Sequence, residues 1–155
     1  MQKKQGDTTG QIEFTLSPPE KDQAALLAAI DQFGIEQGLL ESFRYRLGLI
    51  VDELVTNSTV HGTCSGADQT VKVYIAVHES NLVIEIVDSG LPFDPTTHPL
   101  PHCCPQDGPV SVGGAGLSLV RRLADQIHYS RSNDHNHLVI TLNTAKKETA
   151  CLLKK

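Results

Sequence analysis

Two adjacent stretches near the middle of the chain, TVKVYIAVHE and NLVIEIVDSG, constrain the fold more than any other part of the sequence. In each stretch apolar side chains occupy every second position, which is typical of a β-strand with one buried face. The connection between them, Glu79-Ser80-Asn81, has the length of a hairpin turn. The sequence therefore predicts an antiparallel strand pair that ends at Asp88-Ser89-Gly90.

The flanking segments supply helices and further strands. Ser17, followed by two prolines and an acid, is typical of a helix N-cap and first turn, and Gly38 is typical of a helix end. Apolar residues at helical intervals mark the next helix. The predicted helices cover residues 17–38, 41–61 and 113–127. The further predicted strands cover residues 11–16, 127–132 and 137–143, with the last two joined by a turn at 134–136.

Composition limits the class of protein. The chain has 155 residues, of which 39% are hydrophobic and 20% charged, as in an ordinary single-domain protein. We expect one domain over residues 10–145, with flexible tails at 1–9 and 146–155. A net charge of -5 without a long basic run disfavours direct nucleic-acid binding. Without a signal peptide or a long apolar run, we expect a cytoplasmic protein that does not enter a membrane.

Three polar residues in the second predicted helix are spaced four apart and so lie on one helical face. They are Glu53, Asn57 and His61. The carboxylate of Glu53 could act as a general base, and the amide oxygen of Asn57 suits a hard cation such as Mg2+. The alternative is a solvated polar face without chemistry. His61, at the helix end, is expected to interact with the helix dipole.

Two other segments hold candidate binding groups. Asp88 ends an apolar strand, where its carboxylate could accept a hydrogen bond from the amino group of a base or simply cap the turn. The glycines of GGAG, residues 113–116, open a helix whose free N-H groups could bind phosphate or merely allow a tight turn. Residues 91–112 hold six of the eight prolines and little periodicity, which is typical of a functional loop or a disordered segment.

Together these segments resemble a known family. The ordered motifs ELVTNSTVHG, DSGLPFDP and GGAGLSLVRRLAD are similar to the N, G1 and G2 boxes of the GHKL ATPase/kinase superfamily. Within it the chain is most similar to the small anti-sigma factor serine/threonine kinases of bacteria. The resemblance covers roughly residues 10–145. It implies an α/β fold: a two-layer α/β sandwich of the Bergerat type, with a mixed, mostly antiparallel sheet covered on one face by about three helices.

The resemblance also implies a role for each matching position. Glu53 would be the general base toward the attacking hydroxyl, and Asn57 would coordinate Mg2+. Asp88 would bind the adenine amino group of ATP, and Gly90 would keep the pocket floor open. Residues 91–112 would form the ATP lid. The residues expected to wrap the nucleotide at the start of the next helix are Gly114, Gly116 and Leu117.

The sequence departs from the family pattern at two places. Ser58 follows Asn57 where an alanine is usual, and His135-Asn136-His137 stands where family members often carry a glycine-threonine pair. That threonine assists adenine binding, so this contact is not expected here.

The implied function is regulatory phosphorylation. The chain would transfer the γ-phosphoryl group of ATP to a serine or threonine of an anti-sigma factor antagonist, and it would sequester a sigma factor as a homodimer. The alternatives are a non-catalytic ATP-binding or protein-interaction module and an ATPase that uses water. A zinc site is a further alternative. Its possible ligands lack the paired spacing of a zinc knuckle; they are His61, Cys64, His98, His102, Cys103 and Cys104.

Overall fold

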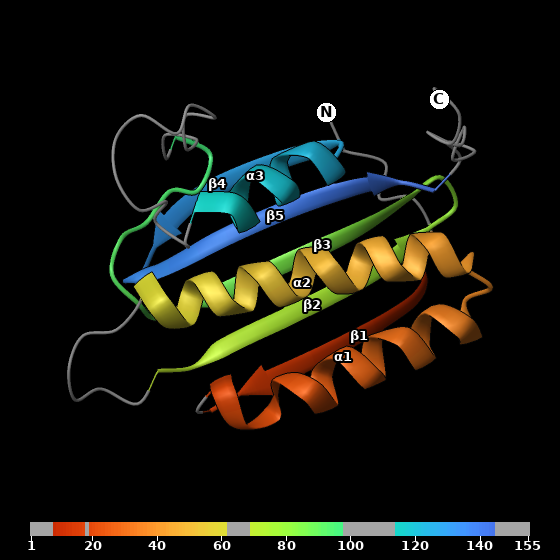
Figure 1. The fold of residues 1–155 in the computed structure, drawn as a ribbon, viewed down its shortest axis with the longest axis horizontal. Helices are drawn as coiled ribbons and strands as arrows, with labels where there is room; N and C mark the ends of the chain where they lie inside the picture. Colours follow the sequence, from red (N-terminus) through yellow and green to blue (C-terminus); the bar gives the residue numbers. More distant parts are fainter. Residues whose placement is uncertain (1–7, 18, 62–68, 98–113, 145–155) are drawn as a thin grey trace.

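The computed structural model describes residues 8–17, 19–61, 69–97 and 114–144. Within them five strands and three helices follow one another along the chain (Figure 1). Their order is β1 (Thr8–Leu16), α1 (Pro19–Glu36), α2 (Glu41–His61), β2 (Val71–His78), β3 (Asn81–Asp88), α3 (Gly114–Leu123), β4 (Gln126–Ser132) and β5 (His135–Asn143). No helix in this described part is long and apolar enough to cross a membrane.

The five strands form one sheet in the order β1-β2-β3-β5-β4. All four pairings in the described sheet are antiparallel, in line with the largely antiparallel sheet that we expected. The predicted hairpin is confirmed as β2 and β3, with Ile75 opposite Ile84. The β3–β5 pairing places Asp88 opposite Asn136, so it joins two segments that lie far apart in the sequence.

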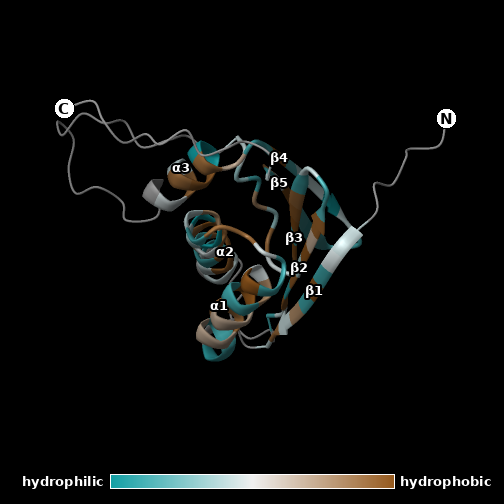
Figure 2. Ribbon diagram, turned by 90° about the vertical axis from the view of Figure 1, so that its right-hand side faces the viewer, coloured by the Kyte–Doolittle hydropathy of each residue, from teal (hydrophilic) through white to brown (hydrophobic). Residues whose placement is uncertain are grey.

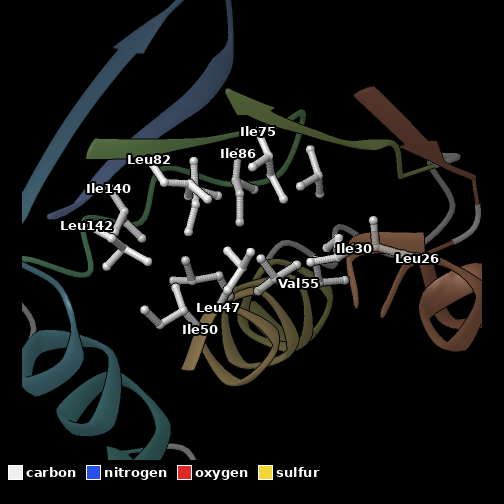
Figure 3. Packing of buried hydrophobic residues seen from close by; sticks show 14 of the residues in the cluster. Leu26, Ile30, Leu47, Ile50, Val55, Ile75, Leu82, Ile86, Ile140 and Leu142 are labelled. Atoms are coloured by element: carbon white, nitrogen blue, oxygen red, sulfur yellow. The ribbon is translucent and has the colours of Figure 1, made fainter. Parts of the chain in front are cut away.

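The three helices cover one face of this sheet and complete a two-layer α/β sandwich (Figure 2). The predicted apolar stripe of α2 is fully buried at Leu47, Ile50 and Val51. Figure 3 shows Leu47 and Ile50 of α2 facing inward side chains of the strands, among them Leu82 and Ile140. Burial of each such side chain contributes about 1.5–3 kcal/mol to stability. Packing of α2 on the sheet therefore fixes the helix that carries Glu53 and Asn57.

The β4–β5 hairpin differs from the sequence prediction. Its turn lies at Asn133 and Asp134, whose φ angles are 49° and 61°. Two consecutive residues with positive φ are typical of a two-residue type I′ turn, and Asn and Asp tolerate that conformation. The predicted turn at 134–136 was wrong, because β5 already begins at His135 and Asn136 is part of the strand.

The end of α3 also differs from the prediction. The helix ends at Leu123 rather than at residue 127. The amide of Ala124 still donates to the carbonyl of Val120 over 2.9 Å, whereas the next amide, that of Asp125, donates to Thr141 of β5 over 3.0 Å. The chain therefore passes from helix to sheet within two residues, and β4 begins at Gln126.

Candidate functional site

A pocket lies between α2, α3 and the ends of β3 and β5. Its empty volume, including space open to solvent, is about 410 Å³. Apolar side chains form most of its wall, with a few polar groups among them, as is usual for a small-molecule site. The lining residues are Leu54, Asn57, Ser58, Ile86, Asp88, Leu91, Phe93, Pro95, Leu117, Tyr129, Asn136 and Leu138.

Asp88 lies at the floor of the pocket and is only 7% exposed. Its Oδ1 accepts hydrogen bonds from the backbone N-H of Gly90 and from Nδ2 of Asn136, both over 2.9 Å. Its Oδ2 accepts a hydrogen bond from the hydroxyl of Ser58 over 3.1 Å. The carboxylate is thus held in one orientation by the segment after β3, by β5 and by α2. An ionised carboxylate has about four acceptor positions, so one remains on Oδ2.

Asn136 is the buried partner that the sequence analysis missed, and it is 5% exposed. Besides its bond to Asp88, its Nδ2 donates to the carbonyl of Leu91 over 2.8 Å. Its Oδ1 accepts from the hydroxyl of Tyr129 over 2.7 Å and from the guanidinium of Arg131 over 2.9 Å. The signal that could have found Asn136 is the alternation of HNHLVITLN, which places it on the same face as the buried Leu138 and Ile140.

Glu53 and Asn57 lie one turn apart on α2, as predicted from their spacing. Asn57 lines the pocket, and its Nδ2 is buried with no hydrogen-bond partner among the described residues. Glu53 is half-buried and packs against Gly116 of α3, where a Cβ would lie only 1.9 Å from Oε2 of Glu53. His61, the third predicted residue, ends α2, but its side chain lies outside the described part of the structure.

The glycines of the third motif frame the other wall. Gly114 is the first residue of α3. The free N-H groups in the first turn of this helix therefore lie near the contact between Gly116 and Glu53. Leu117, one residue further, is 3% exposed and lines the pocket. Gly90 is buried, and its carbonyl accepts a hydrogen bond from Arg131 over 3.1 Å. Asn57, Asp88 and Leu117 therefore line the pocket, and Gly114 and Gly116 belong to the adjoining helix start, whereas Gly90 is not among the lining residues.

The segment after β3 closes one side of the pocket. Leu91, Phe93 and Pro95 line it, and the guanidinium of Arg121 on α3 donates two hydrogen bonds to the carbonyl of Pro95. This segment is the first part of the predicted lid. The rest of the predicted lid, residues 98–112, lies outside the described residues.

Two metal sites were considered from the sequence, a Mg2+ site at Asn57 and a zinc site. The buried Nδ2 of Asn57 has no partner among the described residues, and as an N-H donor it suits a phosphate oxygen. The amide oxygen of the same side chain is the atom that would hold a hard cation beside that phosphate. The candidate zinc ligands Cys64, His98, His102, Cys103 and Cys104 and the His61 side chain lie outside the described residues. Within the described residues no group of three or more His, Cys, Asp or Glu side chains could hold a metal ion.

Comparison with known proteins gives the family. Over 102 residues the chain is 28% identical to the serine/threonine-protein kinase BtrW of Bordetella bronchiseptica, covering 66% of this chain and 72% of that protein. The fold is similar to a crystal structure of the RsbU and RsbW domains of a Mycobacterium tuberculosis protein, with a TM-score of 0.57 and 15% identity. That match covers 86% of this chain but only 32% of the other. Residues 17–142 match the histidine kinase-like ATPase domain, and the chain therefore belongs to that family.

Proposed function

We propose that this chain is an ATP-dependent protein serine/threonine kinase that phosphorylates an anti-sigma factor antagonist and sequesters a sigma factor. The observation that carries the proposal is a pocket lined by one carboxylate, that of Asp88, with a second carboxylate, that of Glu53, beside the adjoining start of α3. Asp88 is buried and oriented at the floor, and Glu53 lies half-buried beside the start of α3. The family supplies the ATPase class, and BtrW, a relative, is named a serine/threonine-protein kinase.

The floor of the pocket suits adenine. The remaining acceptor position on Oδ2 of Asp88 can receive one N-H of the adenine amino group. Leu54, Ile86 and Leu138 offer apolar surface for the base. Adenine would thus be bound by one directed hydrogen bond and by apolar packing.

The opposite end suits the phosphates. Amide N-H groups at the start of α3 carry the positive end of the helix dipole, which favours phosphate oxygens. Asn57 would hold Mg2+, which when bound neutralises phosphate charge and so assists phosphoryl transfer. Gly114, Gly116 and Leu117 would wrap the nucleotide on this side. The lid that we propose for residues 91–112 would complete the enclosure.

Glu53 is the proposed general base. Its carboxylate accepts the proton of the serine or threonine hydroxyl while the hydroxyl oxygen bonds to the γ-phosphorus. The bond from that phosphorus to the oxygen bridging the β- and γ-phosphates breaks, and ADP leaves. The products are ADP, a phosphorylated antagonist and a protonated Glu53 that returns its proton to solvent.

The partners follow from the resemblance to the anti-sigma factor kinases. We propose a cytoplasmic homodimer that holds a sigma factor until the antagonist competes for the complex. Phosphorylation of the antagonist would end that competition. The chain would not contact nucleic acid directly, which agrees with its net charge of -5.

The first test is Mg2+-dependent ATP binding by calorimetry. Wild type should bind ATP more tightly with Mg2+ than without it, and Asn57→Ala should lose most of that gain. Gln32→Ala is the matched control, because it removes an exposed amide on α1 away from the pocket. Undetectable ATP binding by the wild type in both conditions would refute the nucleotide site. ATP binding without transfer of labelled phosphate to any cognate antagonist would instead leave a non-catalytic binding module.

A further inference from the structure

The hydrogen bonds around Asn136 fix which end of its amide faces Asp88. The guanidinium of Arg131 has only donors, so the amide atom that it contacts over 2.9 Å must be Oδ1. Nδ2 then faces the carboxylate of Asp88. The direction of donation therefore runs from Arg131 through Asn136 to Asp88, and the amide cannot reverse without placing two donors against each other.

Asn136 has no hydrogen-bonding capacity left for a ligand. Both hydrogens of Nδ2 are used, by Asp88 and by the carbonyl of Leu91. Both acceptor positions of Oδ1 are used, by Tyr129 and Arg131. An amide has two donors and about two acceptor positions, so this buried side chain is fully satisfied. A polar effect of Asn136 on a bound base must therefore act through the groups that it orients, of which Asp88 carries the acceptor at the pocket floor.

On the carboxylate of Asp88 only Oδ2 keeps an acceptor position for a ligand. Gly90 and Asn136 fill the positions on Oδ1. Ser58 donates its single hydroxyl hydrogen to Oδ2, so the hydroxyl oxygen keeps its acceptor positions. The pocket floor thus offers two neighbouring acceptors, Oδ2 of Asp88 and Oγ of Ser58, and neither carries a free donor. Such a pair suits an amino group and opposes a carbonyl oxygen.

We infer that Asn136 and Ser58 make the pocket selective for a purine that carries an amino group at position 6 over one that carries a carbonyl there. Asn136 is a positioning residue, which keeps Asp88 oriented as an acceptor. Ser58 supplies the second acceptor. This inference rests on the proposed nucleotide site and concerns the two positions at which the chain departs from the family pattern.

The test compares the affinities for ATP and inosine triphosphate, which has a carbonyl in place of the amino group. Asn136→Asp keeps the shape of the side chain but turns its donor toward Asp88 into an acceptor. Two carboxylates this close favour the uptake of one proton. A proton taken up on Oδ2 of Asp88 would then be donated to the inosine carbonyl. The preference for ATP over inosine triphosphate should fall about tenfold, the effect of roughly one hydrogen bond.

A ratio of affinities separates positioning from general damage, because a loosened pocket weakens both nucleotides alike. Asn133→Asp is the matched control: it makes the same chemical change at an exposed turn position of the same hairpin, and it should leave the ratio unchanged. An unchanged ratio in folded Asn136→Asp would overturn the inference.

Ser58→Ala tests the inference if Asn136→Asp does not fold. It removes one of the two acceptors and leaves the contact between Asp88 and Asn136 in place. The ratio should then fall about threefold, less than for a full hydrogen bond, and no change would overturn the inference. If wild type binds neither nucleotide, the proposed function fails first. If wild type prefers ATP and the tested variants keep that preference, only this inference fails.

Discussion

The two ends of the pocket are built differently. At the floor, Asp88 and Asn136 are less than 10% exposed and connected by hydrogen bonds to β4, α2 and the segment after β3. At the other end, toward the start of α3, the amide nitrogen of Asn57 has no partner among the described residues, and Glu53, which lies beside the pocket, is half-buried. One end is satisfied by the protein itself, whereas the other retains hydrogen-bonding capacity for a ligand.

This difference separates two kinds of contribution. Buried polar groups that bond one another are costly to disturb, because removal of one partner leaves the others buried and unsatisfied. Groups that await a ligand contribute little to the stability of the free protein. We therefore expect substitutions at the floor to change binding and stability together, and substitutions near Glu53 to change the reaction while the fold stays intact.

The largest expected effect is on phosphoryl transfer in Glu53→Gln. Glutamine keeps the size of the side chain but cannot accept the hydroxyl proton, so the rate should fall by about 10²–10⁴, the usual contribution of a general base. ATP affinity and the melting temperature should stay close to those of wild type. Single-turnover transfer of labelled phosphate to a cognate antagonist measures the rate. Glu41→Gln, an exposed change in the first turn of the same helix, is the control. A Glu53→Gln rate equal to wild type would exclude Glu53 as the base.

The next largest effect is expected for Asp88→Ala, in which ATP affinity and the free energy of unfolding should both decrease. The variant removes the acceptor of three hydrogen bonds, from Gly90, Ser58 and Asn136. Unfolding free energy should decrease by about 2–3 kcal/mol, because the donors of Gly90 and Asn136 remain buried. ATP affinity should fall about 100-fold, as expected when a buried charged hydrogen bond of about 1.5–3 kcal/mol is lost. Urea unfolding and calorimetry measure the two quantities. Weaker binding at wild-type stability would contradict the view of a self-supporting floor.

The sequence predicted the local parts of this arrangement and missed the non-local ones. The alternation in β2 and β3 and the short connection between them were enough for the hairpin, and hence for Asp88 at a strand end. The spacing of Glu53 and Asn57 was enough to place them on one face of α2. Their roles in catalysis and Mg2+ binding stay predictions.

Asn136 and Ser58 could not be assigned in the same way. The polar run NDHNH favours a turn at several positions, and the actual turn depends on which two residues adopt positive φ. The contact of Asn136 with Asp88 depends on the register between β3 and β5, and that of Ser58 on the packing of α2 over β3. Neither relation has a local signal in the sequence.

The smallest predicted effect is that of Gly116→Ala, which adds one methyl group beside Glu53. It gives the most direct comparison between the two ends of the pocket. In Gly116→Ala the new Cβ would lie 1.9 Å from Oε2 and 2.7 Å from Cδ of Glu53, so the carboxylate has to move. It lies at the end of a flexible side chain and can do so at little cost. Alanine also favours a helix over glycine by up to about 1 kcal/mol. Phosphoryl transfer should therefore fall about tenfold, since a misplaced base loses part of its contribution, while stability stays the same or rises.

The matched control is Gly48→Ala on α2, where an added Cβ meets no atom within 4 Å. It makes the same change in a helix and should raise stability by a similar amount without altering transfer. A comparable loss of activity in both variants would mean that helix stiffness, rather than the position of Glu53, limits the rate. A loss of stability in Gly116→Ala alone would mean that the contact between α2 and α3 supports the fold. In that case the two ends of the pocket would be less different than their hydrogen bonds indicate, because the reactive end would also be structural.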